Sequence, residues 1–244
     1  METADHLDVL RASSDALLGS ARGGLDRPVP SCPGWDVADL VVHIGLTWSW
    51  AAEIVRTGAP AERDRPPSDR SEPSLLGWAA GRAEHLLARL GAAEPDATCW
   101  TFGAPATNRF WARRQALETV LHAWDVQAAS GGPAAIDPEV SADGVDEYLG
   151  VMIPRWMQRH PEAGWSGESL HLHRTDGDGE WVVRLGPEGA VSTDRAHSKA
   201  DVALRGPAEG LWLWCCNRAS LDAAGIAVFG DRSVADRWTS EISF

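Results

Sequence analysis

The sequence predicts an α+β protein with a helical N-terminal part and a smaller α/β C-terminal part. Up to about residue 160, apolar residues recur every three or four positions, which is the spacing of helices that bury one face. Beyond about residue 164, apolar and polar residues alternate in short runs separated by glycine-rich turns, which is typical of strands. We therefore expect two domains, residues 1–160 and 161–244.

The N-terminal part is predicted to be an up-down four-helix bundle with one extra helix. Asp36 and Asp39 are spaced as an N-cap and its capping-box partner, which predicts that a helix starts after Asp36. Residues 58–73 are polar and rich in proline, so we expect a long mobile loop there. The other predicted helices cover approximately residues 5–22, 74–90, 109–130 and 138–158.

The C-terminal part is predicted to begin with a β-hairpin. Its strands are "ESLHLHRT" and "WVVRL", and "DGDGE" forms the turn between them. Further strands are expected in "ADVALRG" and "IAVFG", and helices in "PAEGLWLWCCNR" and "DRSVADRWTS". This mixture predicts a small α/β domain.

Two histidines share one face of the first hairpin strand. His171 and His173 alternate with Leu170 and Leu172, which we expect to point toward the core. Two histidines at this spacing can bind a metal, but the sequence shows no obvious third ligand. We therefore interpret His171 and His173 as solvent-exposed strand residues.

Composition and charge limit the classes of partner. The chain has 22 Lys and Arg against 35 Asp and Glu, a net charge of −13, so it would repel a phosphate backbone and we expect no nucleic-acid partner. No apolar run approaches the roughly 20 residues that span a bilayer, and the N-terminus lacks the pattern of a signal peptide. The four cysteines form no CxxC pair. We expect a cytoplasmic protein without a membrane segment, and the sequence gives no oligomeric state.

The stretch "LETVLHAWD" raises the question of chemistry. Glu118 and His122 are four residues apart on one helix face, Asp125 follows one turn later, and Arg114 precedes Glu118 by one turn. One interpretation of this polar ridge is a solvated helix face, and the other is part of a metal site. Arg114 could bind a substrate carboxylate or pair with Glu118.

His43 is the candidate for a third ligand. It shares a helix face with Leu40, Thr47 and Trp50, a partly apolar face that we expect to point inward. A histidine in such a place can be a hydrogen-bonded core residue, but facing helices also build metal sites in bundles. Two imidazoles and one carboxylate leave a fourth position open, as in catalytic zinc sites, although other divalent metals including iron accept the same ligands.

Two segments resemble the mycothiol-dependent maleylpyruvate isomerase family, which belongs to the DinB-like helical-bundle superfamily. They are "SCPGWDVADLVVHIG" and, about seventy residues later, "FWARRQALETVLHAWDVQAASG", with a fainter likeness over "ADVALRGPAEGLWLW". The resemblance implies a metal-binding DinB-like bundle followed by a small α/β domain. It also implies that His43, Glu118 and His122 bind zinc, that Asp125 takes part in catalysis, and that the thiol cofactor is mycothiol.

The implied chemistry is attack by a thiolate on a small electrophile. A thiol that binds the open metal position loses its proton and can add to an electrophilic carbon. The product distinguishes a cis-trans isomerase from a thiol S-transferase, and the ligands are the same for both. The family substrate is a dianion, for which Arg114 and Arg218 are our candidate substrate-binding residues, followed by Arg237.

Two other functions stay open. A zinc hydrolase would hold water at the open position and would need Asp125 as its base. A non-enzymatic metal-binding protein built on the same bundle would fill the open position with a fourth protein ligand.

Overall fold

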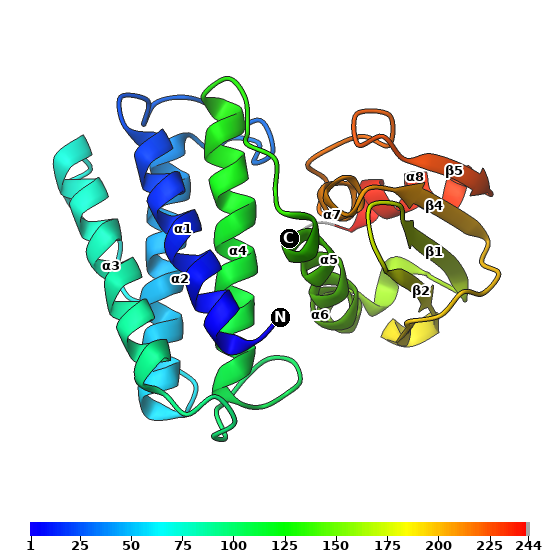
Figure 1. Cartoon of the computed structure of the whole chain (residues 1–244), viewed down its shortest axis with the longest axis horizontal. Coiled ribbons are helices and arrows are strands. Elements are labelled where there is room, and N and C mark those ends of the chain that lie inside the picture. Colours follow the sequence, from blue (N-terminus) through cyan, green and yellow to red (C-terminus); the bar gives the residue numbers. More distant parts are fainter. Residues whose placement is uncertain (243–244) are drawn as a thin grey trace. The chain divides into compact units, whose positions relative to one another are not determined.

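The computed structural model describes residues 1–242, and the chain divides into two compact units, Met1–Ala134 and Ala135–Phe244 (Figure 1). The first unit contains four long helices, and the second combines helices with a five-stranded sheet, so the predicted α+β class is confirmed. The division lies earlier than the expected one between residues 160 and 161. The boundary is earlier than expected because the predicted extra helix packs within the second unit.

The first unit is a bundle of four helices. Helices α1 and α2 each pack against both α3 and α4. Helix α2 starts as predicted, because the Asp36 carboxylate accepts a hydrogen bond from the Asp39 backbone and the Asp39 carboxylate accepts one from the Asp36 backbone. The four helices are α1 (Thr3–Ala21), α2 (Val37–Thr57), α3 (Glu72–Ala92) and α4 (Asn108–Ala129).

The directions of the helices differ from the expected up-down alternation, because α2 and α3 run parallel. The backbone amide of Gly23, just after α1, donates to the carboxylate of Glu72 at the start of α3. Arg70 forms an ion pair of 2.8 Å with Asp39 in the first turn of α2. Both contacts place the start of α3 beside the start of α2.

The segment between α2 and α3 makes this parallel arrangement possible. Residues 58–71, if extended, can span about 46 Å, whereas a 21-residue helix such as α3 is only about 32 Å long. The segment is tied to the bundle: the Trp50 indole donates to the Ala61 carbonyl (2.9 Å), and Arg82 pairs with Asp64 (2.8 Å). The expected loop is therefore present, and side chains of α2 and α3 anchor it.

The second unit begins with the extra helix. Helix α5 (Pro138–Glu147) continues through a π-helical turn (Tyr148–Met152) into α6 (Ile153–Arg159), which matches the predicted helix over 138–158. Helix α5 packs against α7 (Ala208–Cys215), and Gly144 of α5 lies against the ring of Trp212. This contact explains why α5 belongs to the second unit.

The sheet has the strand order β3-β2-β1-β4-β5. Strands β1 and β2 form the predicted antiparallel hairpin, β1 pairs with β4 in parallel, and β4 pairs with β5 antiparallel. The strands are β1 (Glu168–Arg174), β2 (Glu180–Leu185), β3 (Val191–Asp194), β4 (Val202–Gly206) and β5 (Ala227–Gly230). Short 3-10 turns (Pro161–Ala163, Pro187–Gly189) and α8 (Arg232–Glu241) complete the unit.

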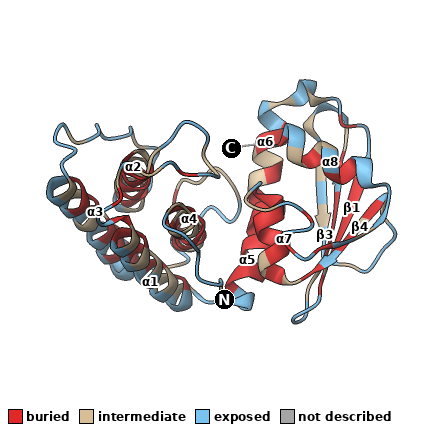
Figure 2. Cartoon of the chain, turned by 90° about the horizontal axis from the view of Figure 1, so that it is seen from above, coloured by how far each residue is buried: buried red, intermediate tan, exposed pale blue. Residues whose placement is uncertain are grey.

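Buried side chains concentrate on the inner sides of the bundle helices and, in the second unit, on α5, α7 and the central strands (Figure 2). Tryptophan supplies many of the largest ones, as its abundance in the sequence suggests. Seven are almost completely buried: Trp48, Trp111, Trp165, Trp181, Trp212, Trp214 and Trp238. Across residues 1–242, the structure has no helix with the length and apolar character needed to cross a bilayer.

Replacing Gly144 with alanine tests the packing of α5 on α7. A Cβ at this position would collide with the ring of buried Trp212, so we expect Gly144→Ala to lower the free energy of unfolding by about 1–3 kcal/mol. Gly150→Ala is the matched control, because its Cβ would meet nothing within 4 Å and alanine favours a helix. Urea unfolding followed by tryptophan fluorescence measures both variants. A Gly144→Ala protein as stable as the Gly150→Ala control would contradict this packing.

Candidate metal centre

Three potential metal ligands converge in the first unit. His43 comes from α2, and Glu118 and His122 come from neighbouring α4. His43 Nε2 lies 3.6 Å from Glu118 Oε1, and the ring centroids of His43 and His122 are 5.1 Å apart. Each residue offers one ligand atom, and these atoms lie within 4.8 Å of one another. Glu118 and His122, on the polar ridge of α4, therefore face His43. This arrangement favours part of a metal site over the alternative of a fully solvated helix face.

A buried carboxylate fixes the orientation of His122. Nδ1 of His122 donates to Oδ2 of Asp125 at 2.9 Å, and Asp125 is completely buried. The other carboxylate oxygen of Asp125 accepts a hydrogen bond from the Ser31 hydroxyl. Since Nδ1 contacts Asp125, Nε2 is the nitrogen of His122 that would bind a metal. A carboxylate behind a ligand histidine is a common arrangement at metal centres, where it also raises the basicity of the ring.

Electrostatics keep Glu118 in the charged form that a metal requires. Burial by itself would raise the pKa of Glu118, but the positive charge of Arg114, together with His43 and His122, outweighs it and holds the pKa well below its usual value. Nε of Arg114 lies 3.2 Å from Glu118 Oε2, and Arg114 is itself buried. Of the two roles considered for Arg114, the structure shows the pairing with Glu118.

Two neighbours of the site were not recognised in the sequence. Ser31 belongs to the loop before α2 and is 94 positions away from Asp125, so no local spacing could link them. Trp35 immediately precedes the Asp36 cap of α2, and nothing in its local sequence links it to a metal site. Its ring is partly exposed and lies 5.2 Å, centroid to centroid, from the ring of His43.

The candidate arginines Arg218 and Arg237 belong to the second unit, so they are not among the residues that the first unit brings together. Nη1 of Arg218 donates to the backbone carbonyl of Cys216 at 2.8 Å. Arg237, on α8, forms ion pairs with Glu168 (2.7 Å) and Glu241 (2.9 Å). Their role toward a substrate stays a prediction.

The donor set suits a metal with room for an external ligand. Two imidazoles and one carboxylate are typical of catalytic zinc sites, and other divalent metals share this preference. Within residues 1–242, this group of neighbouring ligands has three members, with no fourth His, Cys, Asp or Glu. Such a site differs from structural zinc sites, in which the protein supplies all four ligands.

Comparison with known proteins agrees with this architecture. The family model for the mycothiol maleylpyruvate isomerase N-terminal domain matches residues 7–127, and the model for the C-terminal domain of the same family matches residues 139–237. The gap between the two matches contains the division of the chain at residues 134 and 135. No curated protein sequence matches the chain.

Two solved structures share the fold. The crystal structure of a mycothiol-dependent maleylpyruvate isomerase superposes with a TM-score of 0.65 at 14% identity and covers 93% of each chain. The structure of a mutant of a mycothiol-dependent maleylpyruvate isomerase gives a TM-score of 0.64 at 13% identity, again over 93% of each chain. Since the two family models together span nearly all of residues 7–237, the chain belongs to the mycothiol-dependent maleylpyruvate isomerase family.

Proposed function

We propose that this protein is a metal-dependent enzyme that uses a low-molecular-weight thiol, mycothiol, to attack a small electrophile. Zinc, or another divalent metal, is the proposed ion, and His43, Glu118 and His122 are its proposed ligands. The observation that carries the proposal is the convergence of these three side chains from α2 and α4, with their ligand atoms within 4.8 Å of one another.

The surroundings of the ligands fit a metal ion. Glu118 is held ionised, and Nδ1 of His122 is engaged by Asp125, so both residues present a metal-binding form. A divalent metal held there would lower the pKa of a bound thiol and favour the thiolate near neutral pH. We propose that Asp125 positions His122 and that Arg114 positions Glu118.

The proposed reaction has two possible outcomes. In both, the thiol sulfur forms a bond to an electrophilic carbon. In a cis-trans isomerase, rotation about the resulting single bond is followed by release of the thiol, so the thiol is regenerated. In an S-transferase, the adduct is the product and the thiol is consumed. Family membership favours the isomerase.

The geometry does not favour a hydrolase. That function would require Asp125 as a base for a water molecule, because Glu118 already serves as a ligand. Asp125 is completely buried, and its two oxygens are hydrogen-bonded to Ser31 and His122. These contacts support a positioning role for Asp125.

Removing a ligand should remove one metal ion. We expect His122→Ala to bind one divalent metal fewer per chain than the wild type, as measured by elemental analysis of tag-free protein after reloading with zinc. His85→Ala, an exposed histidine on α3, is the control and should retain the wild-type content. Equal metal content in wild type and His122→Ala would rule out this centre.

A thiol should bind at the metal. After cobalt substitution, mycothiol is expected to change the visible absorption spectrum of the wild type and to leave that of metal-loaded His122→Ala unchanged.

The reaction itself is tested with maleylpyruvate as the probe electrophile. The wild type should convert maleylpyruvate only when thiol and metal are both present. Recovery of the thiol after turnover identifies an isomerase, and its loss identifies a transferase. A cobalt spectrum that mycothiol does not alter would contradict the proposed use of a thiol.

The charge of Asp125 should strengthen metal binding through His122. Asp125→Asn retains the size of the side chain but loses its charge, and we expect zinc affinity to fall about 10- to 100-fold. Competition with a chelator measures the affinity, and circular dichroism checks that the helices are retained. Asp15→Asn, at an exposed position on α1, is the control. If both variants bind zinc with wild-type affinity, Asp125 does not support the metal ligand.

A further inference from the structure

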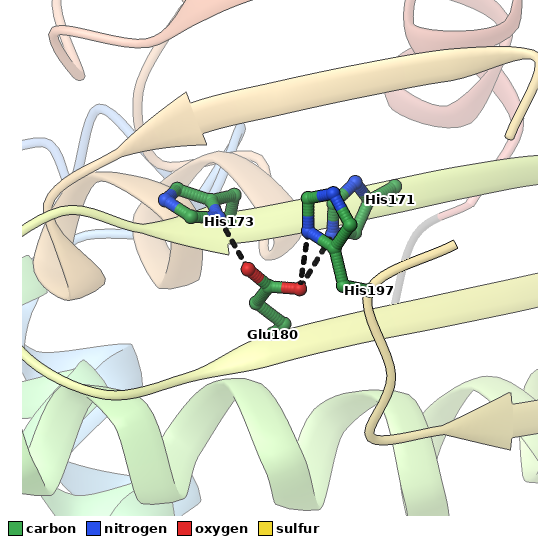
Figure 3. A group of neighbouring side chains, drawn as sticks. All are labelled: His171, His173, Glu180 and His197. Carbon is green, nitrogen blue, oxygen red and sulfur yellow. Dashed lines mark hydrogen bonds and ion pairs between the residues drawn. The ribbon is translucent and has the colours of Figure 1, made fainter. Parts of the chain in front are cut away.

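A second group of potential metal ligands lies on the sheet of the second unit (Figure 3). His171 and His173 lie on β1, and Glu180 lies on β2 directly opposite His173 in the antiparallel register. The fourth member, His197, comes from the connection between β3 and β4. One ligand atom from each of the four lies within 4.8 Å of the others.

The Glu180 carboxylate is at the centre of the group (Figure 3). Nδ1 of His173 lies 2.7 Å from Glu180 Oε1, and Nδ1 of His197 lies 2.8 Å from Oε2. Nε2 of His171 is 3.4 Å from the same Oε2. The predicted solvent exposure of His171 is therefore wrong, since His171 is buried, and the histidine pair does have further potential ligands beside it. No local spacing in the sequence indicates His197, because it is 24 positions beyond His173 and follows β3 in the chain.

The topology of the sheet explains why His197 reaches the others. Strand β3 is at one edge, and β4 lies beyond β2 and β1 in the order β3-β2-β1-β4-β5. The connection formed by residues 195–201 must therefore cross β2 and β1. Its contacts with Glu180 show that it crosses on the face that carries the histidines, opposite to Leu170 and Leu172.

One nitrogen in the group lacks a hydrogen bond. Nε2 of His171 is buried, and its 3.4 Å approach to Glu180 does not form a hydrogen bond. A buried polar atom without a partner costs about 1–3 kcal/mol, so such atoms are uncommon unless an ion or water completes them.

We propose that His171, His173, Glu180 and His197 form a second metal site, which binds zinc or a similar divalent transition metal. Three imidazoles and a carboxylate match the preferences of zinc, cobalt and nickel, whereas magnesium and calcium prefer oxygen ligands. Four protein ligands complete a tetrahedral site, as in structural zinc sites. The ion would fasten the connection of residues 195–201 to the sheet.

This site does not depend on the proposed function, because its ligands all belong to the second unit. The side chain of His197 is 79% exposed, so an ion in the site can exchange with solution and a chelator can remove it. The site is therefore expected to act on stability, by holding one exposed connection in place.

The test uses zinc as the probe and the full chain without an affinity tag. In a His122→Ala background, which removes the first centre, we expect zinc to bind in one equivalent and to raise the melting temperature. Adding His197→Ala should abolish both effects or weaken zinc binding at least 10-fold. Adding His173→Ala should do the same. His160→Ala is the matched control, because this half-exposed histidine of the same unit pairs with Glu162 outside the group.

The outcomes for the two centres can be separated. If the His197→Ala and His122→Ala single variants each bind one zinc fewer than the wild type, and the double variant binds two fewer, both sites are supported. If His197→Ala and His173→Ala bind as much zinc as the His160→Ala control, the four residues are only a hydrogen-bonded cluster and the second site is ruled out. Circular dichroism confirms that the variants are folded, and the exposed position of His197 makes its replacement the least disruptive.

Discussion

The buried carboxylate of Asp125 is the constraint around which the first unit is organised. A completely buried charge is costly unless hydrogen bonds compensate it, and here His122 and Ser31 supply them. The bond to His122 sets the orientation of a candidate metal ligand on α4. The bond to Ser31 ties the loop before α2 to α4, five residues ahead of the Asp36 cap that starts α2. One carboxylate therefore links the ligand pair on α4 to the helix that carries His43.

The candidate centre also depends on charge balance within α4. Arg114, one turn before Glu118, helps to keep that partly buried carboxylate ionised, so the candidate centre holds an anionic group whether or not a metal is bound. In the second unit the carboxylate among imidazoles is Glu180 on β2, which two histidines of β1 and one from the connection between β3 and β4 approach. Both groups place one carboxylate among imidazoles, but the first is built on two helices and the second on a sheet and the connection that crosses it.

Sequence reasoning succeeded where structure depends on near neighbours. The spacing of Glu118 and His122, the Asp36–Asp39 cap and the β1–β2 hairpin are local patterns, and the structure contains all three. It failed where the partners are distant. No period in the sequence links Ser31 to Asp125 or His197 to Glu180, and the packing of α5 on α7 depends on a contact between Gly144 and Trp212. The direction of α3 likewise depends on the course of residues 58–71, which have no regular pattern.

The order in which the bundle helices pack has a consequence for synthesis on the ribosome. Helical proteins usually fold quickly because neighbouring segments pack first, but α1 and α2 here pack mainly against α3 and α4. The nascent chain therefore cannot bury the apolar faces of its first two helices until α3 and α4 have left the exit tunnel. Since α4 also brings Glu118 and His122 to His43, the three candidate ligands meet only at this last stage, and any ion that binds them would then stabilise the finished bundle.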